Sequence, residues 1–143
     1  MSDWKVLLVD DEADFVDVLA DRLEARDLEV FKANSGAAAL ALAQERTFDA
    51  IVLDMAMPGM NGIETLERLL EINPDLQVIL LTGRATLEQA AAAIRTGALD
   101  LLEKPAEIDT LVEKIELAAT RRWSLEEKRI EERVADIIRK KGW

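Results

Sequence analysis

Three short runs of apolar residues, each followed by a polar residue, constrain the fold of this chain more than any other feature. The runs span Val6–Val9, Ala50–Leu53 and Val78–Leu81. An apolar run of this length between turn signals is typical of a strand that is buried on both faces of a sheet. Two further segments with strand character span Leu28–Ala33 and Leu99–Glu103. The sequence therefore predicts five strands.

The segments between the predicted strands carry the apolar spacing of helices. After the first strand, one helical face is formed by Phe15, Val18, Leu19 and Leu23. Alanine-rich helices are expected at Ala37–Gln44 and Leu87–Thr96, and Thr86 with Gln89 predicts a capping box at the start of the second. Strands that alternate with helices predict an α/β fold: a doubly wound, five-stranded parallel sheet of flavodoxin-like topology, with the βα unit repeated five times and an extended C-terminal helix.

The composition excludes several kinds of site. The chain of 143 residues has no cysteine and no histidine, which rules out disulfides, thiolate catalysis, imidazole metal sites and a phosphohistidine of its own. The net charge of −11 argues against direct binding to nucleic acid, because such binding depends on neutralising phosphates. No apolar stretch is long enough to span a membrane and the N-terminus lacks a signal-peptide pattern, which predicts a cytoplasmic protein.

Acidic residues stand at the ends of two of the predicted buried strands. Asp54 closes the central strand, and a proline–glycine and an asparagine–glycine pair then force a loop. Asp10, Asp11 and Glu12 follow the first strand, where Asp11 is expected to cap the next helix. A helix start needs one such acid, so the other two have no structural reason to be there. For Asp54, a role in capping the turn is the alternative to a functional role.

Polar residues at four strand ends are predicted to meet. Because the carboxyl ends of parallel strands share one edge of a doubly wound sheet, we expect Asp10, Asp11, Asp54, Thr82 and Lys104 to converge there. Clustered carboxylates repel one another unless a cation joins them, and oxygen ligands beside a phosphate favour Mg²⁺. A cation, an ammonium and a hydroxyl around one carboxylate suit phosphoryl transfer, with Asp54 as the nucleophile that becomes an aspartyl phosphate.

With these motifs, the chain resembles a response-regulator receiver domain of a two-component system. The motifs that match in order and spacing are Val6–Glu12, Val52–Gly62, Leu81–Ala85 and Glu103–Pro105. The resemblance covers Lys5 to about Ala119, and the four motifs together are highly specific. It implies a chemotaxis-regulator-like fold and a role in signal transduction.

The resemblance also implies a role for each residue at the strand ends. Asp54 would be the phosphoacceptor, with Thr82 and Lys104 in contact with the phosphoryl group. Mg²⁺ would be bound by Asp10, Asp11, Asp54 and the backbone carbonyl of Ala56. The donor would be a phosphohistidine on a sensor histidine kinase or a phosphotransfer protein. Such a domain is a switch rather than an enzyme, although it assists its own phosphotransfer and slow dephosphorylation.

The chain departs from the family's usual pattern at one position, and two further positions are variable in that family. Leu101 occupies the place of a Tyr or Phe that usually moves inward on phosphorylation, so the usual aromatic readout is in doubt. Ala56 and Arg84 correspond to positions that influence hydrolysis of the phosphoryl group. Arg84 could cover the phosphate, reach a partner, or simply be a solvated surface residue.

The C-terminal part of the chain differs in composition from the rest. We expect a receiver domain over residues 1–120 and a helical extension over 121–143. The extension has eight Lys and Arg against five Asp and Glu, a net charge of +3. Because the whole chain has a net charge of −11, the domain has a net charge of −14. An apolar stripe along one helix is formed by Val112, Ile115, Ala119, Trp123, Ile130, Val134 and Ile137. This stripe predicts a homodimer through the C-terminal helix, and the alternative is a tail that folds back onto its own domain.

Two other functions fit parts of the pattern. One is a hydrolase that forms an aspartyl phosphate, but such enzymes need a second acid at the position that Ala56 occupies. The other is an interaction module that is not phosphorylated. Because the extension is short, we expect no DNA-binding helix-turn-helix output domain within it.

Overall fold

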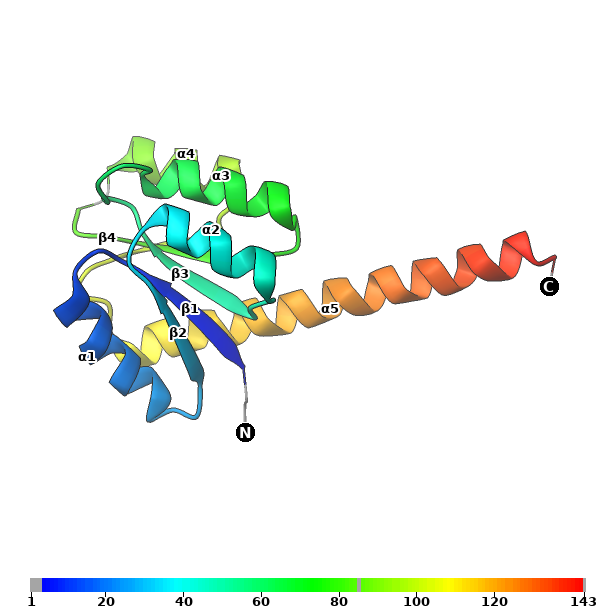
Figure 1. Ribbon diagram of the computed structural model, residues 1–143, viewed down its shortest axis with the longest axis horizontal. Coiled ribbons are helices and arrows are strands. Elements are labelled where there is room, and N and C mark those ends of the chain that lie inside the picture. The colour runs from blue at the N-terminus through cyan, green and yellow to red at the C-terminus, as the bar shows by residue number, and fades with distance from the viewer. Residues whose placement is uncertain (1–3, 85, 143) are drawn as a thin grey trace.

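The computed structural model describes residues 4–84 and 86–142, and its core is a five-stranded parallel sheet with helices on both faces (Figure 1). The strands are β1 (Lys5–Val9), β2 (Glu29–Ala33), β3 (Ala50–Asp54), β4 (Val78–Thr82) and β5 (Asp100–Glu103). The helices are α1 (Ala13–Glu24), α2 (Gly36–Glu45), α3 (Gly62–Ile72), α4 (Leu87–Thr96) and α5 (Ile108–Lys140). The strand order is β2-β1-β3-β4-β5, and every neighbouring pair is parallel. The predicted fold class is confirmed.

Two apolar layers hold the helices against the sheet. One layer packs α1 and α5 on one face, with buried side chains such as Leu23 and Ile115. The other packs α2, α3 and α4 on the opposite face around Phe48, Leu66 and Leu69 (Figure 1). The three continuous apolar runs form the three inner strands, because only inner strands are covered on both faces.

Polar side chains cap three of the five helices. Ser35 accepts a hydrogen bond at the start of α2 and Asn61 does so at the start of α3. Thr86 and Gln89 form the predicted capping box of α4. The expectation for α1 was wrong: its N-cap residue is Glu12, and the cap position makes no side-chain hydrogen bond within the described residues.

The oxygen that satisfies the backbone before α1 comes from Asp10 rather than Asp11. The Glu12 N–H donates to Oδ1 of Asp10 over 3.0 Å. Asp10 can reach this N–H because it is the last residue before the loop, two positions upstream. Asp11 is consequently left with its side chain exposed and unused by the helix.

Helix α5 is one uninterrupted helix of 33 residues, longer than the sheet that it crosses (Figure 1). Its last buried residue is Ala119, and the helix continues for about 30 Å beyond it at about 1.5 Å per residue. The helix does not turn back: its first part past Ala119 contacts the domain through Arg122 and Arg129, and its outer part runs straight away from the domain. No helix in the described ranges combines the length and apolar character that crossing a membrane requires.

Candidate functional site

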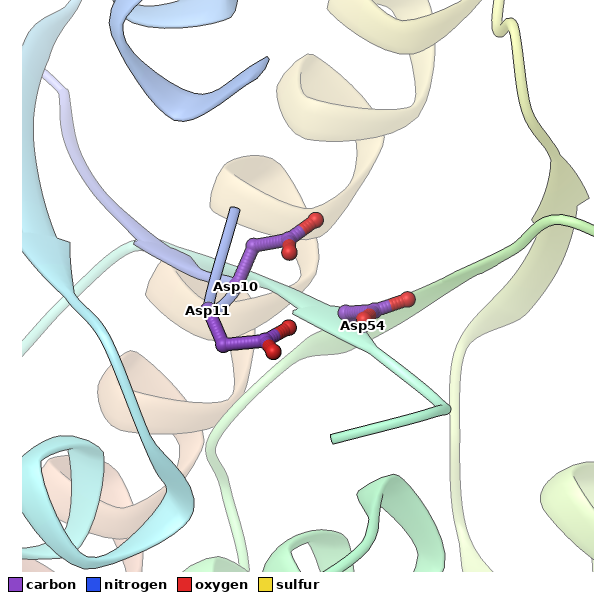
Figure 2. A group of neighbouring side chains, drawn as sticks. All are labelled: Asp10, Asp11 and Asp54. Carbon is purple, nitrogen blue, oxygen red and sulfur yellow. The ribbon is translucent and has the colours of Figure 1, made fainter. Parts of the chain in front are cut away.

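Three carboxylates converge at the carboxyl edge of the sheet, as the sequence predicted. Asp10, Asp11 and Asp54 each offer an oxygen atom, and these atoms all lie within 4.8 Å of one another (Figure 2). Asp10 and Asp54 are buried, with 5% of each residue exposed, whereas Asp11 is open to solvent. Two buried acids beside a third one make a strongly negative pocket with one open side.

The sheet topology explains why these acids meet. β1 and β3 are adjacent and parallel, with Val9 in register with Leu53. The next residue on each strand is therefore an acid, Asp10 on one and Asp54 on the other. Their apolar predecessors are buried on both faces, so neither strand can shift its register without exposing its apolar residues.

Lys104 provides the positive charge of the pocket. It follows β5, and its Nζ donates a 2.7 Å hydrogen bond to Oδ2 of Asp10 and lies 3.3 Å from Oδ1 of Asp54. A third acid, Glu12, lies 3.9 Å away. The same Nζ stands 4.3 Å from the ring centre of Phe15, a distance at which the ring face attracts a cation. One ammonium thus serves several carboxylates.

The pKa of Asp54 reflects first its burial and then the charges beside it. Burial raises the pKa of the Asp54 carboxyl above its ordinary value, the Asp10 carboxylate raises it further, and Lys104 offsets only part of this. Burial opposes the charge of Lys104, but its hydrogen bond to Asp10 and the attraction of Asp54 outweigh that, so the pKa of Lys104 is raised. Asp54 would therefore gain from an additional cation.

Thr82 lies at the expected strand end but does not join this network. It is the last residue of β4, and its neighbour Leu81 is in register with Asp54. Its buried hydroxyl donates to the Arg84 carbonyl over 3.2 Å and accepts from the Arg84 N–H over 3.3 Å. The hydroxyl is thus at the pocket edge, bonded within its own loop. Ala85, the last residue of the predicted motif, lies outside the described residues.

The loop after Asp54 is held by a close backbone contact. The Gly62 N–H donates to the Met55 carbonyl over 2.9 Å, which closes the loop that carries Ala56. A Cβ on Gly62 would lie 2.6 Å from Met55 Cα and 2.8 Å from the backbone oxygen of Asp54. Only glycine allows α3 to start so near the strand end, and this contact keeps exposed Ala56 beside the acids.

The pocket fits a hard divalent cation. Its donor set is all oxygen, and the three carboxylates lie close enough to share one ion. Asp54, with its raised pKa, is the group that would gain most from the added positive charge. These properties match Mg²⁺ or Ca²⁺ rather than softer metals.

Two contributors to the pocket were missed from the sequence. Phe15 was assigned to the apolar face of its helix, and Glu12 was considered only with the neighbouring acids. Both lie near Lys104, which comes from the far end of the chain. No spacing rule links Phe15 to Lys104, so only the folded chain reveals this contact.

Comparisons with known proteins agree with this geometry. Residues 6–116 match the sequence model of the response regulator receiver domain. The transcriptional regulatory protein ZraR of Escherichia coli O157:H7 is 38% identical over 113 residues, which is 79% of this chain and 26% of ZraR. This chain therefore spans about a quarter of the length of that relative.

Two solved structures are similar in fold and informative about the pocket. One is a response regulator protein from Burkholderia pseudomallei with a phosphorylated aspartic acid, a calcium ion and citrate, at 26% identity and a TM-score of 0.75. The match covers 98% of this chain and 86% of that one. The other is the beryllofluoride-activated NtrC4 receiver domain dimer, at 32% identity and a TM-score of 0.78, covering 82% and 98% of the two chains.

Proposed function

This chain belongs to the response regulator receiver domain family, and we propose that it is a phosphorylatable switch whose phosphoacceptor is Asp54. The observation that carries the proposal is the convergence of Asp10, Asp11 and Asp54 around one open pocket, with Lys104 bonded into it. Burial and the charge of Asp10 leave Asp54 in need of positive charge. That is the environment that a metal-assisted phosphoryl transfer to a carboxylate requires.

In the proposed reaction, an Asp54 carboxylate oxygen attacks phosphorus while the bond from phosphorus to the donor nitrogen breaks. The donor is a phosphohistidine of a sensor histidine kinase or a phosphotransfer protein. Asp10, Asp11, Asp54 and the Ala56 carbonyl would hold Mg²⁺, which would supply positive charge against the phosphoryl oxygens. Lys104 supplies a second positive charge, and Thr82 supplies a hydroxyl once it leaves the Arg84 backbone.

The phosphorylated aspartate and calcium ion of the Burkholderia relative support this proposal. So does the beryllofluoride activation of the NtrC4 receiver domain. The hydrolase alternative is less well supported, because Ala56 has no acid to protonate a leaving group. The ZraR relative is about four times as long as the matched region, so it has further segments outside its receiver domain. We propose that the extension of this chain and its binding partners determine the signalling output.

Acetyl phosphate with Mg²⁺ tests the phosphoacceptor. The protein should form an acid-stable adduct, detected by intact mass, that requires Mg²⁺. Asp54→Asn should abolish the adduct, while Asp14→Asn, an exposed acid on α1, should leave it unchanged. Rapid multiple turnover without a stable adduct would favour the hydrolase. Absence of any adduct in the wild type would favour the unphosphorylated interaction module.

We also propose that α5 pairs with α5 of a second copy. Five large apolar side chains on its outer part are 40–57% exposed, and they are Trp123, Ile130, Val134, Ile137 and Ile138. They gather on one side of the helix. Trp123 bonds to Asp49 of the domain, whereas the outer part of α5 runs beyond the domain, so this chain cannot cover the stripe from Ile130 onward. An identical helix offers a matching stripe, and two-fold pairing is the commonest form of self-association.

A matched pair of variants tests this surface by light scattering. Ile130 and Leu117 are similarly exposed, at 57% and 53%, but point about 140° apart around the helix. Ile130→Glu should produce a monomer, whereas Leu117→Glu should remain dimeric, with and without beryllofluoride. A wild-type monomer at high micromolar concentration, or loss of the dimer in Leu117→Glu alone, would reject the proposed surface.

A further inference from the structure

At the edge of the sheet opposite the acidic pocket, a buried carboxylate holds α5. Asp49 directly precedes β3, and only about a tenth of its side chain is exposed. Its Oδ1 accepts hydrogen bonds from Arg122 Nη1 over 2.9 Å and from Trp123 Nε1 over 3.0 Å. Its Oδ2 accepts from the backbone N–H of Lys5 over 2.8 Å. Both partners from α5 lie beyond Ala119, the last buried residue of that helix.

A second carboxylate holds α5 two turns further on. Asp75 lies in the loop before β4, and its side chain is 17% exposed. Arg129 bonds both of its oxygens: Nη2 donates to Oδ1 over 2.7 Å, and Nε donates to Oδ2. A planar two-point contact of this kind fixes direction as well as distance. This bond to Arg129 lowers the pKa of Asp75 below its ordinary value.

The two contacts act where the helix has no other support. Most helical stability in proteins comes from tertiary packing, and past Ala119 the helix has no fully buried residue. Arg122 and Arg129 span two turns on the side that faces the sheet edge. Glu126 lies between them on that side, 3.7 Å from Arg122 Nη2. The apolar residues from Ile130 onward begin where these contacts end.

The contacts also connect the extension to particular strands. Asp49 precedes β3, which ends in Asp54, and Asp75 is in the loop before β4, which ends in Thr82. Each strand spans only five residues, so each contact lies one strand length away from the pocket. The surface of the domain that receives the extension is thus formed by the far ends of the two strands that end in the proposed phosphorylation site.

We propose that Asp49 and Asp75 form a docking site for the extension of this same chain, which fixes the direction in which α5 leaves the domain and ties it to β3 and β4. The two acids are positioning residues: they do not touch the phosphoryl site, and Asp49 contacts the apolar stripe through the indole N–H of Trp123. Their function is to hold the stripe at a set angle for its partner. This inference goes beyond the proposed phosphorylation and does not depend on it.

Distance measurements between two spin labels test the docking site. The chain has no cysteine, so labels attach only at Glu67→Cys on α3 and Glu132→Cys on the extension, both exposed. An Ile130→Glu background keeps a second copy from supporting the helix. The parent should give one narrow distance distribution. Asp75→Asn or Arg129→Gln should broaden it about twofold or more, because one anchoring pair is then lost.

A double variant and a matched control show whether loss of the Asp75–Arg129 pair causes the broader distance distribution. If the pair itself holds the helix, Asp75→Asn with Arg129→Gln should be no broader than either single variant. Asp136→Asn removes an acid that pairs only within α5, with Arg139 at 3.3 Å and Lys140 at 3.2 Å, and should stay as narrow as the parent. Single variants as narrow as the parent, or additive broadening, would overturn the proposal.

The phosphorylation assay separates this inference from the proposed function. The anchor variants should still form the Asp54 adduct with acetyl phosphate, because Asp75 and Arg129 lie at the other end of the strands. A parent that shows a narrow distribution but no adduct would refute the phosphoacceptor and leave the docking site intact. If the parent forms the adduct but the single variants have the same distance distribution as the parent, the docking site is refuted and the phosphoacceptor is supported.

Discussion

The ammonium of Lys104 lies 3.3 Å from the Asp54 carboxylate, at the bottom of a pocket whose other acids also draw on its charge. Its shorter contact is with Asp10, at 2.7 Å. Lys104 therefore compensates the acids collectively rather than pairing with one of them. A metal cation bound to these acids would have the Lys104 ammonium as a neighbour on the same carboxylates. A phosphoryl group on Asp54 would give the ammonium a new negative partner.

Lys104→Ala should separate metal binding from the response to phosphorylation. Mg²⁺ affinity, measured by calorimetry, should remain largely intact because the carboxylate ligands are unchanged. Adduct formation with acetyl phosphate should slow by about 10²-fold, since a charge that stabilises the phosphoryl oxygens is lost. Lys114→Ala, which removes a half-buried lysine paired with Asp100 at 2.8 Å, is the control and should match the wild type.

The complementary change is Asp11→Asn, which should weaken Mg²⁺ binding about tenfold or more because affinity depends on the number of charged ligands. Equal Mg²⁺ affinity in Asp11→Asn and the wild type would contradict the assigned ligand set. Loss of Mg²⁺ binding in Lys104→Ala would mean that the lysine chiefly maintains the structure of the pocket.

Gly62→Ala should distort the loop that follows Asp54. Its Cβ would lie 2.6 Å from the Met55 Cα, and backbone atoms cannot move aside as a flexible side chain can. We expect a loss of about 1–3 kcal/mol in the free energy of unfolding, measured with urea, and weaker Mg²⁺ binding. Gly83→Ala is the control, because no described atom lies within 4 Å of the added Cβ. Equal effects of the two substitutions would show that the close contact is unimportant.

The Asp75–Arg129 contact should make part of the stability depend on pH. The pKa of Asp75 is lowered in the folded protein, chiefly by its hydrogen bond to Arg129 and further by the charge of Arg122. The ionised form is therefore favoured by folding. The resulting stabilisation is present above the ordinary aspartate pKa of 3.8 and is lost as the pH falls through the lowered value.

The comparison of wild type with Asp75→Asn measures this contribution. Arg129 is 60% exposed, so solvent screening limits the difference in unfolding free energy to about 0.5–1 kcal/mol at pH 6. The difference should shrink toward zero near pH 2 and also decrease in high salt. A difference that persists unchanged at low pH would show that charge is not its source.

Two truncations should differ because the docking contacts lie between them. A chain that ends after Arg129 keeps both contacts and loses the apolar residues from Ile130 onward, so it should be a monomer of nearly full stability. A chain that ends after Arg121 should also be monomeric and still fold. It leaves Asp49 without Arg122, and an uncompensated buried charge costs about 3 kcal/mol. Thermal unfolding of the two truncated chains measures the difference in stability. Equal stabilities would contradict the prediction.

The amino-acid sequence alone determined the sheet and the elements of the pocket. Continuous apolar runs become inner strands because only those strands are covered on both faces, and the polar residue after each run must then stand at the sheet edge. That reasoning placed Asp10, Asp54 and Thr82 at one edge of the sheet, and the end of the predicted fifth strand placed Lys104 at the same edge. The apolar stripe from Val112 to Ile137 likewise predicted that α5 continues past the domain.

Tertiary structure decided which of these groups bond to one another and where the extension is held. Lys104 bonds to Asp10, and Thr82 bonds to its own loop rather than the acids. In the sequence, nothing distinguishes Asp49 and Asp75 from other polar residues that precede strands. In the structure they accept hydrogen bonds from Arg122 and Arg129, which are 73 and 54 positions away. Local patterns report burial and periodicity, which are set by near neighbours, whereas a specific hydrogen bond between distant residues depends on how the packed helices and strands aim each side chain.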